Sequence, residues 1–170
     1  MKGRAHFQLG SSFLVFISPI LNNYVMIIVK RVKTEEDYQT CLMIRRKVFV
    51  EGQKVPEREE IDSFEKTSIH FLAFYENKPA ATGRLRVEKT FVKFERIATL
   101  EMFRGRGIAS KLMQEMQRLA QKDYPTYQMM MHAQTEAIPF YLKLGWSPNG
   151  ERFFEAGIEH QKMIFPKTIT

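Results

Sequence analysis

The sequence predicts one domain of the mixed α/β class (α+β), built on a mostly antiparallel central sheet of about six to seven strands. Three observations lead to this prediction. The chain has 170 residues, which is a usual size for a single domain. Hydrophobic residues make up 44% of it and include 14 Phe, enough for an ordinary core. Short apolar or alternating segments, typical of strands, are separated by longer segments in which apolar residues recur at helical spacing.

The first predicted elements are a strand, a helix and three more strands. Residues 26–32 are mostly β-branched and apolar, as in a strand. Thr34 can cap the helix that follows. Residues 68–75 and 80–87 form a predicted hairpin, and residues 90–100 complete an antiparallel run of three strands. In this last segment one alternating set consists of Phe94, Arg96, Ala98 and Leu100, and the other of Glu95, Ile97 and Thr99.

A long helix and a crossing strand come next. The apolar face of this helix is formed by Ile108, Leu112, Met116 and Leu119. The helix should stop before Pro125, because proline cannot continue it. Residues 127–132 are strongly apolar, and we expect this strand to lie parallel beside Ile97.

The chain then closes with a short helix and a hairpin. The helix is predicted over about residues 135–144, with Pro139 in its first turn and Gly145 at its end. Residues 153–165 form a final hairpin that turns near residues 156–157.

Residues 1–25 differ from the rest of the chain. Basic residues precede the apolar run 13–17, as in a signal peptide, but Ser18 and Pro19 interrupt this run and no cleavage site follows. The run is also shorter than the about 20 apolar residues that span a bilayer. We interpret residues 1–25 as a dispensable extension and residues 26–170 as the domain. A chain that begins at Met26 is expected to keep its melting temperature and its cofactor affinity.

Composition argues against several classes of partner. The net charge is +7, but Lys and Arg are spread along the chain and no nucleic-acid motif accompanies them. We therefore expect no nucleic-acid and no membrane partner. The single cysteine, Cys41, excludes an internal disulfide and suits a small core residue in a cytoplasmic protein. The four histidines form no close ligand pair, so we expect no metal.

The segment 51–65 carries a run of acidic residues that ends at Glu65. Such runs are usually solvated surface, which is our interpretation. The functional alternative is an acidic wall that attracts an amine.

The segment 104–109 predicts an anion site. It lies between a strand and a helix and contains Gly105 and Gly107, which allow a tight turn and a close approach of ligand to main chain. The first amides of a helix have no internal partner, and their dipole favours an anion. Arg104 and Arg106 add positive charge. A pyrophosphate would suit this loop, although surface loops of similar composition are common.

Three segments resemble the GNAT superfamily of N-acetyltransferases. Arg104-x-x-Gly107-x-Ala109 matches the Arg/Gln-x-x-Gly-x-Gly/Ala signature of that family. Residues 137–146 resemble its Phe-Tyr-x-x-x-Gly-Phe helix, with Trp146 in place of the last Phe. Residues 154–163 are similar to the Glu-x-Gly-Ile-x-His-x-x-Met ending of one small bacterial branch whose acceptor substrate is unassigned.

The resemblance implies helices on both faces of the sheet and a splayed parallel pair of strands in its middle. It implies acetyl-CoA as co-substrate, a primary amine as acceptor and direct attack in a ternary complex. The pantetheine arm would contact Ile97, Ala98 and Thr99, and the pyrophosphate would bind at Arg104, Gly105, Arg106, Gly107, Ile108 and Ala109. Tyr141 matches the tyrosine that protonates the leaving thiolate.

The general base is open at this point. Glu95 is the first candidate, because it lies on the strand that would hold the cofactor. His132 and His160 could bind substrate or relay a proton, because histidine titrates near neutral pH. The alternative for Glu95 is a surface carboxylate that pairs with a neighbouring cation, and the alternative for each histidine is the structural role that a lone histidine more often has.

Two other functions are compatible with the sequence. Residues 46–49 and 60–64 faintly resemble the amino-terminal pattern of acyl-homoserine-lactone synthases, which share the fold. A non-catalytic module that binds acyl-CoA is the second alternative. The acceptor and the oligomeric state, monomer or homodimer, are not determined by the sequence.

Overall fold

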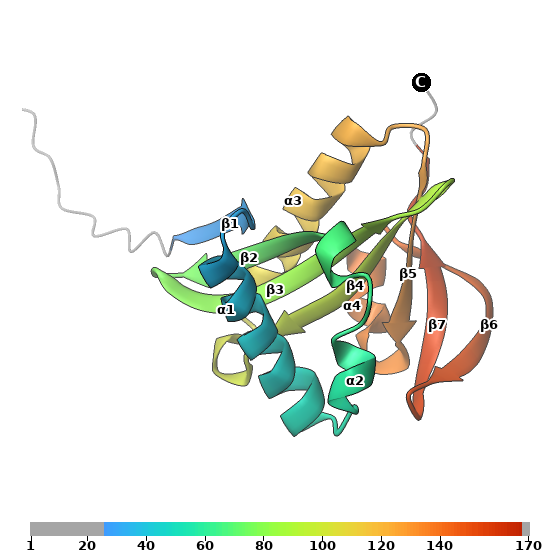
Figure 1. The fold of residues 1–170 in the computed structure, drawn as a ribbon. Coiled ribbons are helices and arrows are strands. Elements are labelled where there is room, and N and C mark those ends of the chain that lie inside the picture. The colour runs from blue at the N-terminus through green and yellow to red at the C-terminus, as the bar shows by residue number, and fades with distance from the viewer. Residues whose placement is uncertain (1–25, 168–170) are drawn as a thin grey trace, which may run out of the picture.

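The computed structural model describes residues 26–167, which form a seven-stranded sheet in the order β1-β2-β3-β4-β5-β7-β6 (Figure 1). Neighbouring strands are antiparallel except β4 and β5. The strands are β1 (Ile27–Arg31), β2 (Ile69–Tyr75), β3 (Lys78–Val87), β4 (Phe91–Thr99), β5 (Gln128–Gln134), β6 (Ser147–Glu155) and β7 (Ile158–Ile164). The predicted fold class is confirmed. The predicted extension, residues 1–25, lies outside the described residues.

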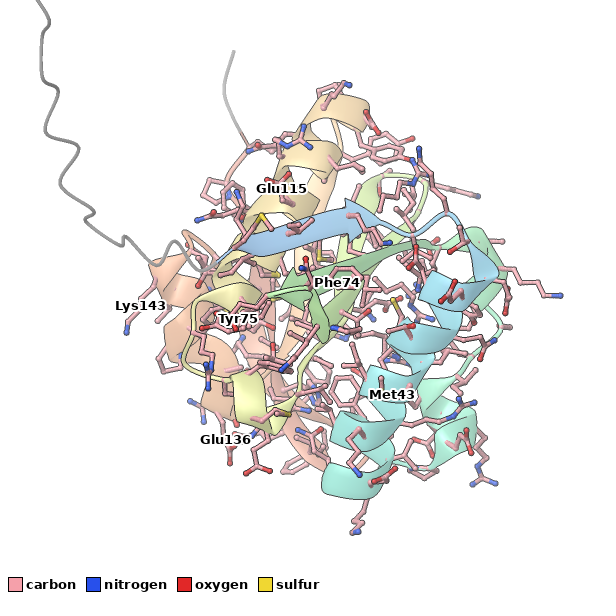
Figure 2. The ribbon with its side chains drawn as sticks, turned by 90° about the vertical axis from the view of Figure 1, so that its left-hand side faces the viewer. Met43, Phe74, Tyr75, Glu115, Glu136 and Lys143 are labelled. Atoms are coloured by element: carbon pink, nitrogen blue, oxygen red, sulfur yellow. The ribbon has the colours of Figure 1, made fainter. Side chains whose placement is uncertain are left out.

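Helices cover both faces of the sheet. The α-helices are α1 (Glu35–Arg45), α2 (Glu57–Glu60), α3 (Ile108–Asp123) and α4 (Ile138–Lys143), and α1 continues into the π-helix η1 (Arg46–Gly52). Short 3₁₀ turns are η2 (Glu65–Thr67), η3 (Glu101–Phe103) and η4 (Thr135–Ala137). Figure 2 looks onto the edge strand β1, with α1 on one side of the sheet and α3 on the other. No helix within residues 26–167 is long and apolar enough to cross a membrane.

Each face has its own apolar core. The larger core lies under α3, whose fully buried side chains include Ile108, Leu112 and Met116, as the helical spacing predicts. Burial of each such side chain stabilises the fold by about 1.5–3 kcal/mol. The smaller core lies under α1 and contains Cys41, Ile44 and Leu72 among its buried residues. Cys41 is therefore a core residue, as predicted.

Local signals in the sequence set the ends of the elements. The Thr34 hydroxyl accepts a hydrogen bond of 3.2 Å from the amide of Asp37 and caps α1. The β2–β3 turn uses positive φ angles at Glu76 and Asn77, which suit a two-residue hairpin. Gly145, with a φ of 87°, ends α4.

The central parallel pair separates partway along its length. Pairing between β4 and β5 runs from Phe91 with Gln128 to Phe94 with Met131. Beyond this point β4 continues to Thr99 and β5 to Gln134, but the two strands no longer pair with each other. The predicted neighbour of β5, Ile97, therefore lies past the last paired residue. The separation leaves two facing strand edges whose polar main-chain groups need other partners.

A β-bulge interrupts β4 in the separated region. Thr82 pairs with Ala98 and Arg84 with Glu95, so β4 holds one residue more than β3 between these pairs. Arg96 takes a φ of 57° there. The bulge turns Ala98 toward the core under α1, whereas Phe94 packs under α3. The predicted strand is correct in position, but its simple alternation is wrong beyond Glu95.

Candidate active site

A cavity of about 520 Å³ opens where β4 and β5 separate. Its walls come from η1, α2, β4, β5, α4 and the β6–β7 turn. Nine of the residues that the sequence singled out line it: Glu95, Ile97, Ala98, Thr99, Arg104, Ala109, His132, Tyr141 and His160. The tertiary structure therefore brings together candidates that are spread over 66 positions of sequence (95 to 160, both included).

Residues 104–109, which we call the glycine loop, border the opening of this cavity, which we call its mouth. A second hollow of about 260 Å³ adjoins it and is lined by Gly105 and Gly107, and the two hollows share Thr99, Arg104 and Ala109. Gly105 and Gly107 have φ angles of 73° and 77°, which L side chains rarely adopt. An added Cβ at either position would meet nothing within 4 Å. The backbone conformation therefore favours glycine here, and the space above the loop stays open.

Main chain and side chains of this loop have different roles. Gly107 is the N-cap of α3 and supplies no side-chain cap, so the first amides of α3 remain available as donors. The Arg104 side chain lies over the mouth, with Nε 3.4 Å from the carbonyl oxygen of Thr99. Arg106 points away and contacts Tyr75, with Nη1 3.3 Å from the phenol oxygen. The Ile108 side chain is buried in the core, so Arg106 and Ile108 can serve an anion through their amides.

Tyr141 approaches the cavity from the core under α3. It lies on α4, is 8% exposed and packs edge-on against Phe140 at 5.0 Å between ring centroids. Burial raises the pKa of the Tyr141 phenol to about 12. The phenol therefore keeps its proton throughout the neutral range and can act as a donor.

Glu95 faces the cavity but is held by cations. Its Oε1 lies 2.7 Å from Nη2 of Arg84 and 3.3 Å from Nε of Arg86, and its Oε2 lies 3.5 Å from Nζ of Lys93. The Glu95 side chain is only 9% exposed. If the Glu95 side chain moved away, the buried guanidinium of Arg84 would lose one of its carboxylate partners.

The acidic segment before β2 is not solvated surface throughout, which corrects our interpretation. Glu60 and Glu65 are 3% and 7% exposed. Arg45 donates to Glu60 and, at 2.8 Å, to Glu65, and Arg84 pairs with Asp62 at 2.7 Å and with Glu65. Because these carboxylates are paired, they form no free acidic wall either. We call Arg45, Glu60, Asp62, Glu65, Arg84, Glu95 and Arg96 the buried ion cluster.

A local feature is associated with this cluster. Arg45 shares the buried side of α1 with Cys41 and Leu42, and a buried guanidinium needs carboxylate partners. The cluster anchors the segment that carries Glu59 and Glu60 into the cavity wall. Arg96, turned outward by the bulge, donates to the carbonyl oxygens of Glu59 and Glu60 at 2.7 and 3.1 Å.

His132 has a partner that the sequence did not reveal. Its Nδ1 lies 3.0 Å from Oε2 of Glu155, and both residues line the cavity. The hydrogen bond from His132 is the largest of several causes that lower the pKa of Glu155 to about 2. His160 is directed differently, with Nδ1 2.8 Å from the carbonyl oxygen of Ile158. Residues 26–167 contain no group of three or more His, Cys, Asp or Glu side chains placed to hold a metal ion.

A polar bridge joins the two walls of the cavity. The side-chain amides of Gln53, next to η1, and Gln134, on β5, exchange two hydrogen bonds of 3.1 and 2.9 Å. Residues this far apart in sequence carry no local signal of such a contact.

A sheet with one separated parallel pair and a glycine-rich helix start at the opening is the arrangement that the resemblance to N-acetyltransferases implies. Comparison of the sequence with family models matches residues 32–166 to the acetyltransferase (GNAT) domain. The chain therefore belongs to the GNAT family of acetyltransferases.

Relatives agree with this assignment. The chain is 36% identical over 133 residues to the uncharacterized N-acetyltransferase YjcF of Bacillus subtilis, covering 78% of this chain and 94% of the relative. It is also 37% identical over 139 residues to the uncharacterized protein YyaT of the same organism, whose name states no activity, covering 79% of this chain and 93% of that protein.

Solved structures share the fold. An acyl-CoA N-acyltransferase from Pseudomonas aeruginosa superposes with a TM-score of 0.73 at 23% identity, over 84% of this chain and 99% of that one. A GNAT family acetyltransferase from Elizabethkingia anophelis with acetyl-CoA bound gives 0.58 at 20% identity, over 81% and 94%.

Proposed function

We propose that the protein transfers an acetyl group from acetyl-CoA to a primary amine, by direct attack in a ternary complex. The observation that carries the proposal is the separation of β4 and β5 into a cavity that ends at the open glycine loop. Pantetheine has two amides and can pair with the free edge of β4 at Ile97, Ala98 and Thr99, as an added strand does. The pyrophosphate then reaches the amides from Arg104 to Ala109 at the start of α3.

The chemistry needs a neutral amine, an acid and a base. The amine nitrogen attacks the thioester carbonyl carbon, the new C–N bond forms, and the C–S bond breaks as the tetrahedral intermediate collapses. Tyr141 gives its phenolic proton to the departing thiolate, and solvent then restores that proton. A base accepts the proton that the amine nitrogen loses, for which Glu95, His132 and His160 line the cavity.

The names of the relatives support the type of reaction and the acetyl donor. The name of YjcF specifies an N-acetyltransferase, and the neighbour from Elizabethkingia anophelis holds acetyl-CoA. Neither name states the acceptor amine.

Replacement of Gly107 by alanine is expected to raise the dissociation constant for acetyl-CoA about tenfold, or about 1.4 kcal/mol. The methyl group would project into the open space over the loop and strain a φ of 77°. Isothermal titration calorimetry measures the constant.

Gly150→Ala is the matched control for this change. Gly150 has a φ of 84° and open space around its Cβ position, but it lies on β6 outside the cavity. Gly150→Ala should lose about as much stability as Gly107→Ala but keep the parental affinity for acetyl-CoA. Equal affinity of the two variants for acetyl-CoA would remove the loop from the cofactor site.

A panel of amines, with CoA release as readout, tests the function itself. We expect turnover with acetyl-CoA on at least one amine, and heat on titration of acetyl-CoA alone. Turnover with S-adenosylmethionine as donor would instead favour the lactone-synthase alternative. Tight binding of acetyl-CoA with no turnover on any amine would favour a non-catalytic module.

A further inference from the structure

We propose that His132 is the general base of this acetyltransferase and that Glu155 is the residue that positions it. The inference rests on the proposed function, because it assigns the group that takes the proton of the amine. The residues come from β5 and from the end of β6, and the tertiary structure brings them to one wall of the cavity.

The hydrogen bond between the two side chains selects one tautomer of the imidazole. An ionised carboxylate only accepts hydrogen bonds, so Nδ1 of His132 must carry the proton that lies 3.0 Å from Oε2 of Glu155. Glu155 stays ionised near neutral pH, because the hydrogen bond from His132, chiefly, lowers its pKa to about 2. Nε2 of His132 is then the nitrogen with a free lone pair. A carboxylate that orients a histidine in this way also stabilises the imidazolium that forms when Nε2 accepts a proton.

Aromatic packing fixes the ring while leaving it accessible. The His132 ring meets Phe153 edge-on, with 4.8 Å between centroids, and Phe153 in turn stacks on His160. The His132 side chain is still 28% exposed, so an acceptor or a water can reach it. On the side of β7, His132 pairs with Lys162, which fixes the backbone that carries the imidazole.

His132 and Tyr141 approach the gap from opposite faces of the sheet. Met131, the last residue of β5 that pairs with β4, lies in the core under α3 together with Tyr141. Because side chains alternate along a strand, His132 points to the other face. In Figure 1 no helix lies in front of β7 and β6 on the face that α1 and α2 occupy. An amine that enters from this open face would meet the base on its own side and the acid beyond the thioester.

The other two candidates are placed less well for this role. Glu95 is bound to Arg84, Arg86 and Lys93, so protonating it would break several ion pairs. His160 has Nδ1 on the carbonyl oxygen of Ile158 and its ring against Phe153, without a carboxylate partner at hydrogen-bond distance within the described chain. His132 alone among the three combines a carboxylate with an accessible second nitrogen.

The charged neighbours of His132 come from three strands. Glu155 on β6 is its hydrogen-bond partner. Lys93 on β4 and His160 on β7 act on the Glu155 carboxylate, and Lys162 on β7 pairs with His132 across β5 and β7. The proton that Nε2 takes from the amine nitrogen leaves to solvent before the next turnover, so no other reactant is required.

The rate of acetylation as a function of pH tests the assignment. His132→Gln is expected to lower kcat at least about 100-fold, the usual value of general base catalysis, and to abolish the acid limb of the kcat/KM profile. Glu155→Gln should lower kcat less, about tenfold, because the neutral amide no longer fixes the tautomer and orientation of the His132 ring. The dissociation constant for acetyl-CoA should stay unchanged in both variants.

Glu159→Gln serves as the control. Glu159 pairs with Arg152 on the same hairpin at 3.1 Å and does not line the cavity. Its variant should keep the parental profile. A His132→Gln enzyme with the parental rate at every pH would overturn the proposal, as would loss of the acid limb in Glu95→Gln alone.

A second measurement separates this inference from the proposed function. Nitrogen-15 NMR of the imidazole reports its tautomer without any substrate. We expect the Nδ1–H form of His132 in the parent protein and a loss of that preference in Glu155→Gln. If no amine is acetylated, the proposed function fails, whereas an Nε2–H tautomer in the parent overturns the dyad itself.

Discussion

Replacement of Arg84 by methionine is expected to lower the free energy of unfolding by about 3–5 kcal/mol, because it leaves buried carboxylates without their counter-charge. Arg84 is 1% exposed and lies at the centre of the buried ion cluster. It pairs with Asp62 and Glu95, each at 2.7 Å, and with Glu65. Methionine fills much of the same volume, so the loss reports the charge rather than a cavity. Urea unfolding followed by circular dichroism measures it.

Arg152→Met provides the matched control for Arg84→Met. Arg152 is 59% exposed and makes one surface pair with Glu159. Surface pairs contribute about 0–1 kcal/mol, so this variant should unfold close to the parent. A loss of less than about 1 kcal/mol in Arg84→Met would mean that the cluster does not anchor the fold.

Arg84→Met should also change how the free energy of unfolding depends on pH in the acid range. Burial raises the pKa of Asp62, but the hydrogen bonds and charge of Arg84 outweigh burial and lower it to about 2. A carboxyl whose folded pKa lies below its unfolded value contributes stability above about pH 4 and loses it as the pH falls toward about 2. Glu65, whose pKa is also lowered, acts in the same sense, and Glu60, whose pKa burial raises, acts against it. In Arg84→Met the acid-side loss of stability should be smaller than in the parent.

Tyr141→Phe is expected to lower kcat at least about 100-fold while leaving the dissociation constant for acetyl-CoA unchanged. The change removes one hydroxyl and keeps the ring that packs against Phe140. Without a donor, the thiolate must leave unprotonated, and the cost falls on the transition state alone. Because burial raises the pKa of Tyr141 to about 12, the parent phenol keeps its proton over the neutral range. Stopped assays of CoA release, combined with calorimetry, separate the two constants.

Tyr124→Phe is the companion control. Tyr124 lies at the carboxyl end of α3 against Tyr127 and does not line the cavity. It should show the parental kcat. A Tyr141→Phe enzyme that turns over at the parental rate would remove Tyr141 from the chemistry and leave it as a packed aromatic.

The order and type of the elements could be predicted because their signals are local. Thr34 caps α1 three residues from its partner, Pro139 and Gly145 frame α4, and apolar spacing places α3. The opening of the cavity could also be predicted, because Gly105 and Gly107 stand in the sequence between a predicted strand and a predicted helix.

The details of β4 could not be predicted. The residues around Arg96 carry no sequence signal for the extra residue of the bulge, because a bulge depends on how β4 pairs with β3. The bulge nevertheless decides that Ala98 faces the α1 side of the sheet and not the α3 side, where Phe94 packs. A site that depends on where two strands separate is therefore seen only in the folded chain.

By itself the sequence determined the fold class, the run of elements and the glycine-rich helix start, since periodicity, caps and turn residues act over a few neighbouring positions. The tertiary structure alone decided which charges are buried and which are paired. Arg45 meets Glu65 across 20 positions and His132 meets Glu155 across 23. Such pairs form because packing of distant segments excludes water and forces each polar group to find a partner, and no local pattern encodes which partner that is.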